Sequence, residues 1–260
     1  MQLTSPFASL CLALSAALPA FAQEAAAPVD PLSFNVSVTT DYRYRGISQT
    51  RLKPALQGGA DYALPGGFYI GAWASTIKWI KDWDVKGPLE LDLYGGYKGE
   101  IQKDFGYDVG LLQYAYVGNK LADVGGGGVF KNANTTEIYG ALTYGPVTGK
   151  LSYALTNLFG NYNFATNEKS SGSWYFDLSG SFDLGSGFSV VPHVGYQKVA
   201  KIDNASYSDY SLTLTKDLGS GFSVSGAIVG TDADKLFYAS PVNGKFLGKT
   251  SGFVSVKYVF

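Results

Sequence analysis

The stretch Ser-Gly-Phe-Val-Ser-Val-Lys-Tyr-Val-Phe, residues 251–260, decides the fold class. Its residues alternate between two faces with a period of two, which is the period of a β-strand. One face is mostly apolar and holds Tyr258, Val256, Val254 and Gly252. A strand with an aromatic residue at its end is typical of the closing strand of a bacterial outer-membrane barrel, where aromatic residues lie at the lipid interface. The last strand of a soluble β-sandwich is the alternative.

Tyr258 and Phe260 are therefore the predicted assembly signal, which the barrel-assembly machinery would recognise. At the other end of the chain, residues 6–22 are mostly apolar or small and finish Ala20-Phe21-Ala22. A small-x-small ending after an apolar run predicts a signal peptide that is cleaved after Ala22, although no Lys or Arg precedes the apolar run. We predict a signal peptide at 1–22, a short periplasmic segment at 23–32 and an outer-membrane barrel at 33–260.

Composition narrows the class further. Glycine makes up 33 of the 260 residues, about 13%, against an average of roughly 7%. Tyrosine (19) and phenylalanine (16) are also abundant, as interfacial aromatic girdles require. The one cysteine, Cys11, lies in the predicted signal peptide, so the mature chain offers no disulfide or thiolate chemistry. No mature segment approaches about 18 uninterrupted apolar residues, which excludes a helical membrane protein.

The sequence predicts an all-β, closed, antiparallel, up-and-down transmembrane barrel of about twelve strands. The predicted strands are Ser33–Arg45, Ala55–Ala63, Phe68–Thr76, Leu89–Lys98, Phe105–Tyr116, Thr136–Tyr144, Gly149–Thr156, Ser173–Phe182, Phe188–Gln197, Tyr207–Lys216, Phe222–Thr231 and Lys249–Phe260. The odd-numbered connections hold 9 to 19 residues and the even-numbered ones 4 to 6. Long extracellular loops alternating with short periplasmic turns are the pattern of an outer-membrane barrel.

Charged residues on the inward parity of these strands are the candidate functional residues. All three arginines, Arg43, Arg45 and Arg51, fall within nine residues, and parity places the first two inside the barrel near its outer end. The candidate pore-lining residues are Asp41, Arg43, Arg45, Glu90, Asp92, Asp108, Glu137, Asp177, His193 and Asp209. Charged rings of this kind orient solutes in pores. The alternative interpretation is a salt-bridge network that ties the wall together.

Signs of catalysis or of bound cofactors are weak. His193 is the only histidine, and a barrel hydrolase would need a nucleophile and an orienting group beside it. Residues 125–128 are all glycine, but no Lys-Ser or Lys-Thr follows, so they do not form a phosphate loop. Asp232 and Asp234 lack the further ligands of a calcium loop. We therefore predict no enzyme activity, no cofactor, no metal and no nucleic-acid partner.

A resemblance to a known family rests on three stretches of sequence. These are Thr-Asp-Tyr-Arg-Tyr-Arg-Gly-Ile-Ser-Gln at 40–49, Gly-Phe-Tyr-Ile-Gly-Ala-Trp at 67–73 and Glu-Leu-Asp-Leu-Tyr-Gly-Gly-Tyr at 90–97. Together with Tyr-Asp-Val-Gly at 107–110, they resemble the TorF-like family of outer-membrane porins in Proteobacteria. The similarity covers essentially the mature chain. It implies a porin whose transport substrate is poorly defined.

The expected function is passive diffusion of small hydrophilic solutes through an outer-membrane channel. The long loops hold 12 Lys or Arg against 7 Asp or Glu, which suits contact with lipopolysaccharide phosphates as well as outer-membrane lipids, although ordinary solvation of the loops would look the same. One alternative is a non-conducting structural or adhesive barrel with a plugged lumen, for which the loop 117–135 is the best candidate plug. An outer-membrane hydrolase is a further alternative, disfavoured by the missing catalytic constellation.

Overall fold

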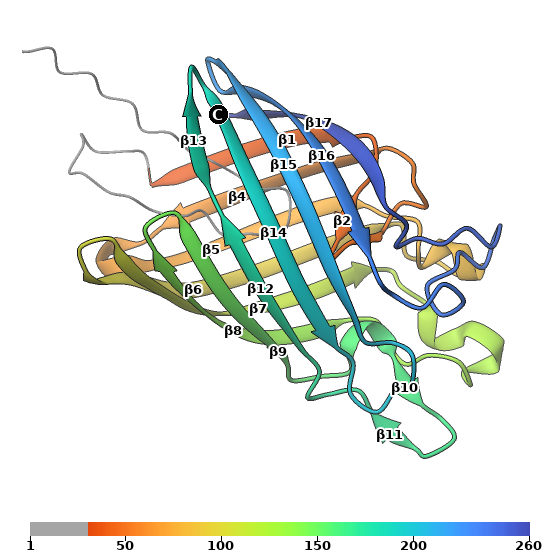
Figure 1. Ribbon diagram of the computed structural model, residues 1–260. Coiled ribbons are helices and arrows are strands. Elements are labelled where there is room, and N and C mark those ends of the chain that lie inside the picture. The colour runs from red at the N-terminus through yellow and green to blue at the C-terminus, as the bar shows by residue number, and fades with distance from the viewer. Residues whose placement is uncertain (1–30) are drawn as a thin grey trace, which may run out of the picture.

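The structure is a computed structural model that describes residues 31–260. The predicted signal peptide at 1–22, and residues 23–30 of the predicted periplasmic segment, lie outside the described residues. The described chain forms one closed barrel with tilted strands, and longer connections gather at one end (Figure 1).

Twelve antiparallel strands make the wall. They follow the chain around the barrel: β1 (Leu32–Thr39), β4 (Ala55–Ala63), β5 (Phe68–Thr76), β6 (Leu89–Gln102), β7 (Phe105–Val117), β8 (Thr135–Tyr144), β9 (Val147–Ala154), β12 (Trp174–Gly180) continued by β13 (Phe182–Gly185), β14 (Phe188–Lys198), β15 (Tyr207–Gly219), β16 (Phe222–Thr231) and β17 (Ser251–Val259). Pairing of β1 with β17 closes the sheet, with Val36 opposite Tyr258. The predicted closed barrel of twelve antiparallel strands is confirmed.

Small elements lie in the connections. Two short hairpins, β2 (Arg43–Tyr44) with β3 (Ile47–Ser48) and β10 (Tyr162–Asn163) with β11 (Glu168–Lys169), belong to long loops. The 3-10 turns are η1 (Pro65–Gly67), η2 (Lys81–Trp83), η3 (Leu121–Gly126) and η4 (Leu158–Gly160). Within residues 31–260, no helix has the length and apolar character needed to cross a membrane.

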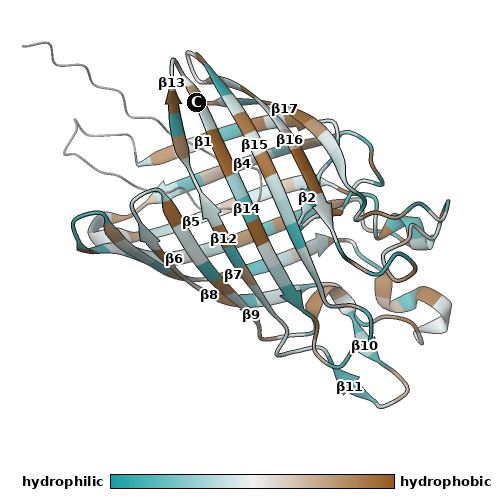
Figure 2. Ribbon diagram, in the orientation of Figure 1, coloured by the Kyte–Doolittle hydropathy of each residue, from teal (hydrophilic) through white to brown (hydrophobic). Residues whose placement is uncertain are grey.

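The two faces of the wall differ in chemistry. Along β1, Phe34, Val36 and Val38 are exposed on the outside, whereas Ser37 and Thr39 are buried on the inside. Figure 2 shows the same alternation of hydrophobic and hydrophilic residues along most wall strands. Rows of apolar side chains facing outward would be unfavourable in water but are stable against lipid.

Aromatic side chains gather on the outside near both ends of the wall. At the short-turn end, Phe68 packs on Tyr97, and Phe222 packs on Tyr258 at 4.4 Å between ring centroids. Phe260 contacts Tyr258 edge to face and is exposed. Near the long-loop end, Trp174 packs against Tyr196. Two aromatic belts flanking an apolar band are the arrangement expected where a barrel crosses both interfaces of a bilayer. The assembly-signal role of Tyr258 and Phe260 stays a prediction.

Three predicted strands match residue for residue, namely β4, β5 and β16. The predicted first strand is wrong at its end, because β1 stops at Thr39 rather than at Arg45. The Thr39 hydroxyl donates to the Asp41 carbonyl, and Arg45 and Gly46 then take positive φ angles of 45° and 78°, which no strand accommodates. The predicted strand Ser173–Phe182 is interrupted at Ser181, between β12 and β13.

Candidate functional site in the barrel lumen

Loop 1, residues 40–54 between β1 and β4, folds into the barrel instead of standing above it. Asp41, Arg43 and Arg45 are each at most 8% exposed, although they belong to a loop. They lie inside the barrel because the loop turns inward, not because they continue the alternation of a wall strand. The motif at residues 41–49 is therefore the sequence of an inward-folded loop.

Asp41 holds the two limbs of loop 1 together. Its carboxylate accepts hydrogen bonds from Arg43 Nε at 2.5 Å, from Ser48 Oγ at 2.6 Å and from Thr50 Oγ1 at 3.2 Å. A carboxylate that accepts several bonds, one of them from a guanidinium, is strongly held when buried. The loop therefore has a fixed internal shape.

Arg43 ties loop 1 to loop 6, residues 232–250 between β16 and β17. Its Nη1 donates to the carbonyls of Leu247 at 2.9 Å and Lys249 at 3.3 Å. The amide of Ser48 also donates to the Leu247 carbonyl at 3.0 Å. Loop 1 and the return segment into the last strand therefore form one packed unit.

Arg45 crosses the lumen and joins two distant parts of the wall. Its guanidinium donates to both oxygens of Glu137 on β8, at 3.0 and 2.8 Å, and to Gln197 Oε1 on β14 at 2.7 Å. It also lies over the rings of Tyr44 and Tyr175, at 4.9 and 4.3 Å from their centroids. Burial alone would lower the pKa of Arg45, but the neighbouring Glu137, Tyr44 and Tyr114 together outweigh it and raise that pKa above the ordinary value. The loop tip is thus held by a charged, bidentate contact.

Aromatic residues fill the rest of the lumen at the long-loop end. The Tyr42 hydroxyl donates to Glu90 at 2.7 Å, and the hydroxyls of Tyr44 and Tyr114 are hydrogen-bonded. The apolar cluster around them includes Tyr42, Ala55, Ile77, Ile80, Leu112, Tyr114, Tyr116, Leu121, Ala133 and Tyr139. This half of the lumen is therefore packed with side chains.

The loop 117–135, expected to be the best candidate plug, contributes to the packing at this end together with loop 1. Leu121 and Ala133 of that loop are fully buried, and they pack against the same cluster as Ile80 of the preceding long loop. The segment whose polar side chains reach across the barrel is loop 1. The longer loop adds apolar side chains to the same cluster, whereas its Lys120 and Asp123 stay at the surface.

Asp92 stands out among the residues beneath the plug. It is 1% exposed, and neither carboxylate oxygen has a hydrogen-bond partner among the described residues. Glu90 precedes it on the same inward face of β6 and is paired with Tyr42. An unpaired buried carboxylate is costly, so this position is a weak point of the packing.

His193 forms a second cluster, further towards the short turns. Its Nδ1 lies 3.0 Å from Asp177 and its Nε2 lies 2.9 Å from Asp209. The Tyr175 hydroxyl donates to Asp209 at 3.0 Å. The side chains of His193 and Asp177 are 11% and 17% exposed, against 2% for Glu137. Asp209, the third member, is as buried as Glu137, so water reaches this cluster only on the side of His193 and Asp177.

Lysines occupy the inside near the short turns, and the charge pattern of the sequence did not single them out. Lys150 lies over the ring of Tyr139 at 4.2 Å, and Lys98 over the ring of Tyr69 at 5.2 Å. Tyr69 donates to Asp108 at 2.6 Å. Lys257 lies on the inward face of β17. Lys98 lies eight residues after Glu90 on β6, and an even separation places both side chains on the same face of a strand. The alternation of the strand could therefore have identified Lys98 as an inward residue.

The ten predicted residues thus lie inside the barrel in three groups. Loop 1 and its contacts hold Asp41, Arg43, Arg45, Glu90, Asp92 and Glu137; the histidine cluster holds Asp177, His193 and Asp209; and Asp108 lies among the lysines. Their lining of a conducting pore stays a prediction.

Within residues 31–260, no group of three or more His, Cys, Asp or Glu residues is arranged to hold a metal ion.

Comparisons with known proteins support the fold. A family model described as "Bacterial protein of unknown function (Gcw_chp)" matches residues 22–260. No curated protein matches the chain. The solved structure of the KdgM porin has a TM-score of 0.53 at 7% identity, covering 88% of this chain and 99% of that one. The NanC porin has a TM-score of 0.51 at 9% identity, covering 88% and 98%. A KdgM porin in complex with disordered oligogalacturonate has a TM-score of 0.51 at 7% identity, covering 88% and 98%.

Proposed function

The chain belongs to the Gcw_chp family of bacterial proteins of unknown function, and we propose that it is an outer-membrane channel for small hydrophilic solutes. The observation that carries the proposal is the contrast between the two faces of one closed wall. The outside presents an apolar band between aromatic belts, whereas the inside carries Arg45, Glu137, His193, Asp177 and further charged residues. A barrel with this contrast has lipid on one side and polar contents on the other.

On this proposal, loop 1 closes the channel at its long-loop end. Passage of solute therefore requires loop 1 to move from its contacts with the wall. Those contacts include hydrogen bonds and ion pairs, as at Arg45 with Glu137 and Gln197, which water can replace when the loop leaves. They also include apolar packing of Tyr42 and Tyr44, which opposes release of the loop. The ten candidate residues, with Lys98, Lys150 and Lys257, would line the path that opens.

Several further assignments follow from this proposal. The long-loop end faces outward, where its loops meet lipopolysaccharide and outer-membrane lipids, and export and the barrel-assembly machinery bring the chain there. The resemblance to the TorF-like porins supports the same function. The structural neighbours are porins, and the complex of one of them with oligogalacturonate supports a hydrophilic solute. On this proposal the protein is a channel and not an enzyme.

A second candidate function is a non-conducting structural barrel, which the packing of loop 1 favours. Single-channel recording in planar bilayers separates the two. We expect infrequent openings from the parent and longer openings from Arg45→Ala/Glu137→Ala, which removes the contact between loop 1 and β8. The matched control is Lys201→Ala/Glu168→Ala, which removes an exposed ion pair of 3.1 Å and should behave as the parent.

Folding of each variant is checked by heat-dependent migration on a detergent gel. Openings in the parent or in the loop 1 variant support the channel. A complete lack of conductance in both, when both are folded barrels, would favour the structural barrel.

A further inference from the structure

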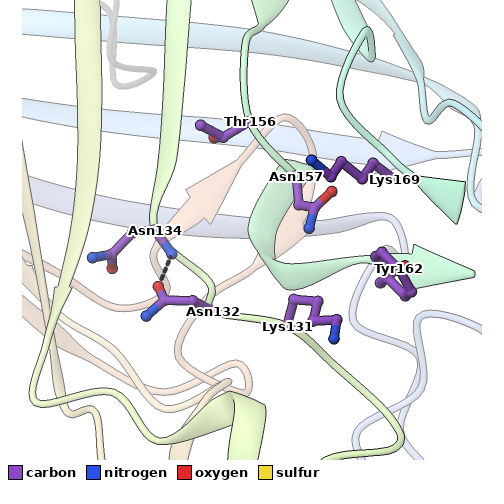
Figure 3. Close-up of a pocket in the computed structure, with 7 residues that line it drawn as sticks. All are labelled: Lys131, Asn132, Asn134, Thr156, Asn157, Tyr162 and Lys169. Carbon is purple, nitrogen blue, oxygen red and sulfur yellow. Dashed lines mark hydrogen bonds between the residues drawn. The ribbon is translucent and has the colours of Figure 1, made fainter. Parts of the chain in front are cut away.

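A polar pocket lies at the long-loop end, outside the lumen plug. It has a volume of about 460 Å³ and is formed by two connections, loop 3 (residues 118–134) and loop 4 (residues 155–173). Figure 3 shows the side chains that line it, which are Lys131, Asn132, Asn134, Thr156, Asn157, Tyr162 and Lys169. None of them belongs to loop 1 or to the residues considered above as pore lining.

The three asparagines of the pocket use their oxygens within the protein. Asn132 Oδ1 accepts from the Asn134 amide at 2.8 Å, and this bond is drawn in Figure 3. Asn134 Oδ1 accepts from the Tyr116 amide at 2.9 Å. Asn157 Oδ1 accepts from the Ser170 amide at 3.2 Å. Because the oxygen of each side chain is engaged, each presents its NH₂ group as the remaining polar end.

Those NH₂ groups have no acceptor in the described part of the chain. The hydrogen bonds formed by Asn132, Asn134 and Asn157 side chains are the accepting ones given above, with one more to Asn134 from Asn119. Asn132 and Asn134 are exposed and Asn157 is half-buried, so these side-chain amides remain free to donate to a ligand at this surface.

Two lysines add positive charge to these donors. Lys131 lies over the rings of Tyr162 and Phe164, at 4.8 and 5.2 Å, and neither Lys131 nor Lys169 forms an ion pair within residues 31–260. Glu168, the neighbour of Lys169 in sequence, pairs with Lys201. The lining contains no carboxylate. Its polar groups are thus mainly donors, and its formal charge is positive.

We propose that this pocket binds an oxyanion group, a carboxylate or a phosphate, carried by a ligand at the outer surface. Such a group has several acceptor oxygens, which match ammonium and amide donors, and its negative charge is attracted to the two lysines. The group can come from a free solute or from the phosphates of lipopolysaccharide. Binding is measured without any conductance readout, so the result of this test is independent of the proposed channel function.

The test uses the folded protein in neutral detergent and isothermal titration calorimetry at low ionic strength. The free probes are inorganic phosphate and glucuronate, with glucose as the uncharged comparison. The second arm uses deacylated lipopolysaccharide core oligosaccharide, either with its phosphates or after their removal. We expect saturable binding of oxyanion-bearing probes and none of glucose.

Three variants assign the binding to the pocket. Lys131→Met/Lys169→Met keeps most of the aliphatic stems and should weaken binding at least about tenfold, since each charge-assisted hydrogen bond contributes about that much. Asn157→Asp keeps an oxygen for the Ser170 amide but replaces the NH₂ donor by a negative oxygen, and it should abolish binding. Lys235→Met/Lys245→Met removes two exposed lysines from loop 6 and is the control for net charge.

The outcomes separate the sources of the ligand. Binding of free phosphate or glucuronate that the pocket variants lose supports a site for a free solute. Binding of the phosphorylated core oligosaccharide alone, with the same losses, supports the oxyanion site and assigns it to lipopolysaccharide. Equal losses in the loop 6 control, equal binding of glucose, or no binding of any probe would overturn the proposal.

Discussion

Arg45 and Glu137 form a bidentate ion pair inside the barrel, although they are 92 residues apart in the chain, with side chains 6% and 2% exposed. Arg45 belongs to a loop and Glu137 to wall strand β8. The pair therefore links the position of loop 1 to the stability of the barrel wall.

The first prediction concerns the energy of this pair. Arg45→Ala or Glu137→Ala alone leaves a buried charge without its partner, and each should lower barrel stability by roughly 3–5 kcal/mol. The double variant removes both charges, so its loss should be clearly smaller than the sum of the two single losses. The measurement is unfolding by urea in detergent, followed by migration of the folded band on a gel. Losses that simply add would show that the two side chains do not stabilise one another.

The second prediction concerns the tip of loop 1. Gly46 has a φ of +78°, and a Cβ at this position would meet the Thr231 and Asp209 side chains of the wall. Gly46→Ala should therefore displace the tip and expose Arg43, Arg45 and Arg51 to trypsin. Gly66 has the same φ of +78°, but a Cβ there would meet no atom within 4 Å. Gly66→Ala thus isolates backbone strain, of about 1–2 kcal/mol, from the steric clash.

Limited proteolysis with mass spectrometry measures this difference. Faster cleavage within residues 40–54 in Gly46→Ala than in Gly66→Ala is the expected result. Equal cleavage in the two variants would mean that close packing of Gly46 against the wall does not hold the loop in place.

The wall was predictable from sequence because its pattern is local. Each strand must place apolar residues towards lipid at every second position, and neighbouring strands connect through short turns or long loops. These constraints act within about ten residues, and β4, β5 and β16 were predicted to the residue. The inside position of Asp92, Glu137 and Asp209 followed from the same parity.

The plug was not predictable because its contacts are distant in sequence. Arg45 meets Gln197 at a separation of 152 residues, and Arg43 meets the Leu247 carbonyl at a separation of 204. Alternation of polar and aromatic residues continues past Thr39, so the pattern alone extends the strand to Arg45. The glycine at position 46 was the available signal, since glycine supplies the positive φ that a turn needs.

The third prediction concerns ion selectivity below loop 1. Lys98, Lys150 and Lys257 place three positive charges inside the short-turn half. Replacing all three with Gln should make the channel more cation-selective, most visibly in the Arg45→Ala/Glu137→Ala background. Reversal potential under a salt gradient measures the change, which should shrink at high salt because the Debye length falls to about 3 Å at 1 M.

The control for this triple variant is Lys235→Gln/Lys245→Gln, which changes exposed loop 6 charge by two units. A similar shift in the control would assign the effect to the surface potential of the loops. An unchanged reversal potential in the folded triple variant would remove these lysines from the conducting path.

The last prediction tests which face of the wall meets lipid, with two adjacent residues of β15. Leu214 is 47% exposed on the outside, and Thr215 faces the inside, where its hydroxyl is hydrogen-bonded to Ser225 at 2.8 Å. An arginine on the lipid face near the middle of a strand costs roughly 2–4 kcal/mol in a bilayer, so Leu214→Arg should fold poorly into phospholipid vesicles. Thr215→Arg loses one hydrogen bond, worth about 1 kcal/mol, and places its charge among polar groups. The measurement is the folded fraction after insertion into vesicles, and again in neutral detergent, where a micelle adapts more easily to the outer charge. If Leu214→Arg inserts as well as the parent while Thr215→Arg does not, the two faces have been assigned the wrong way round.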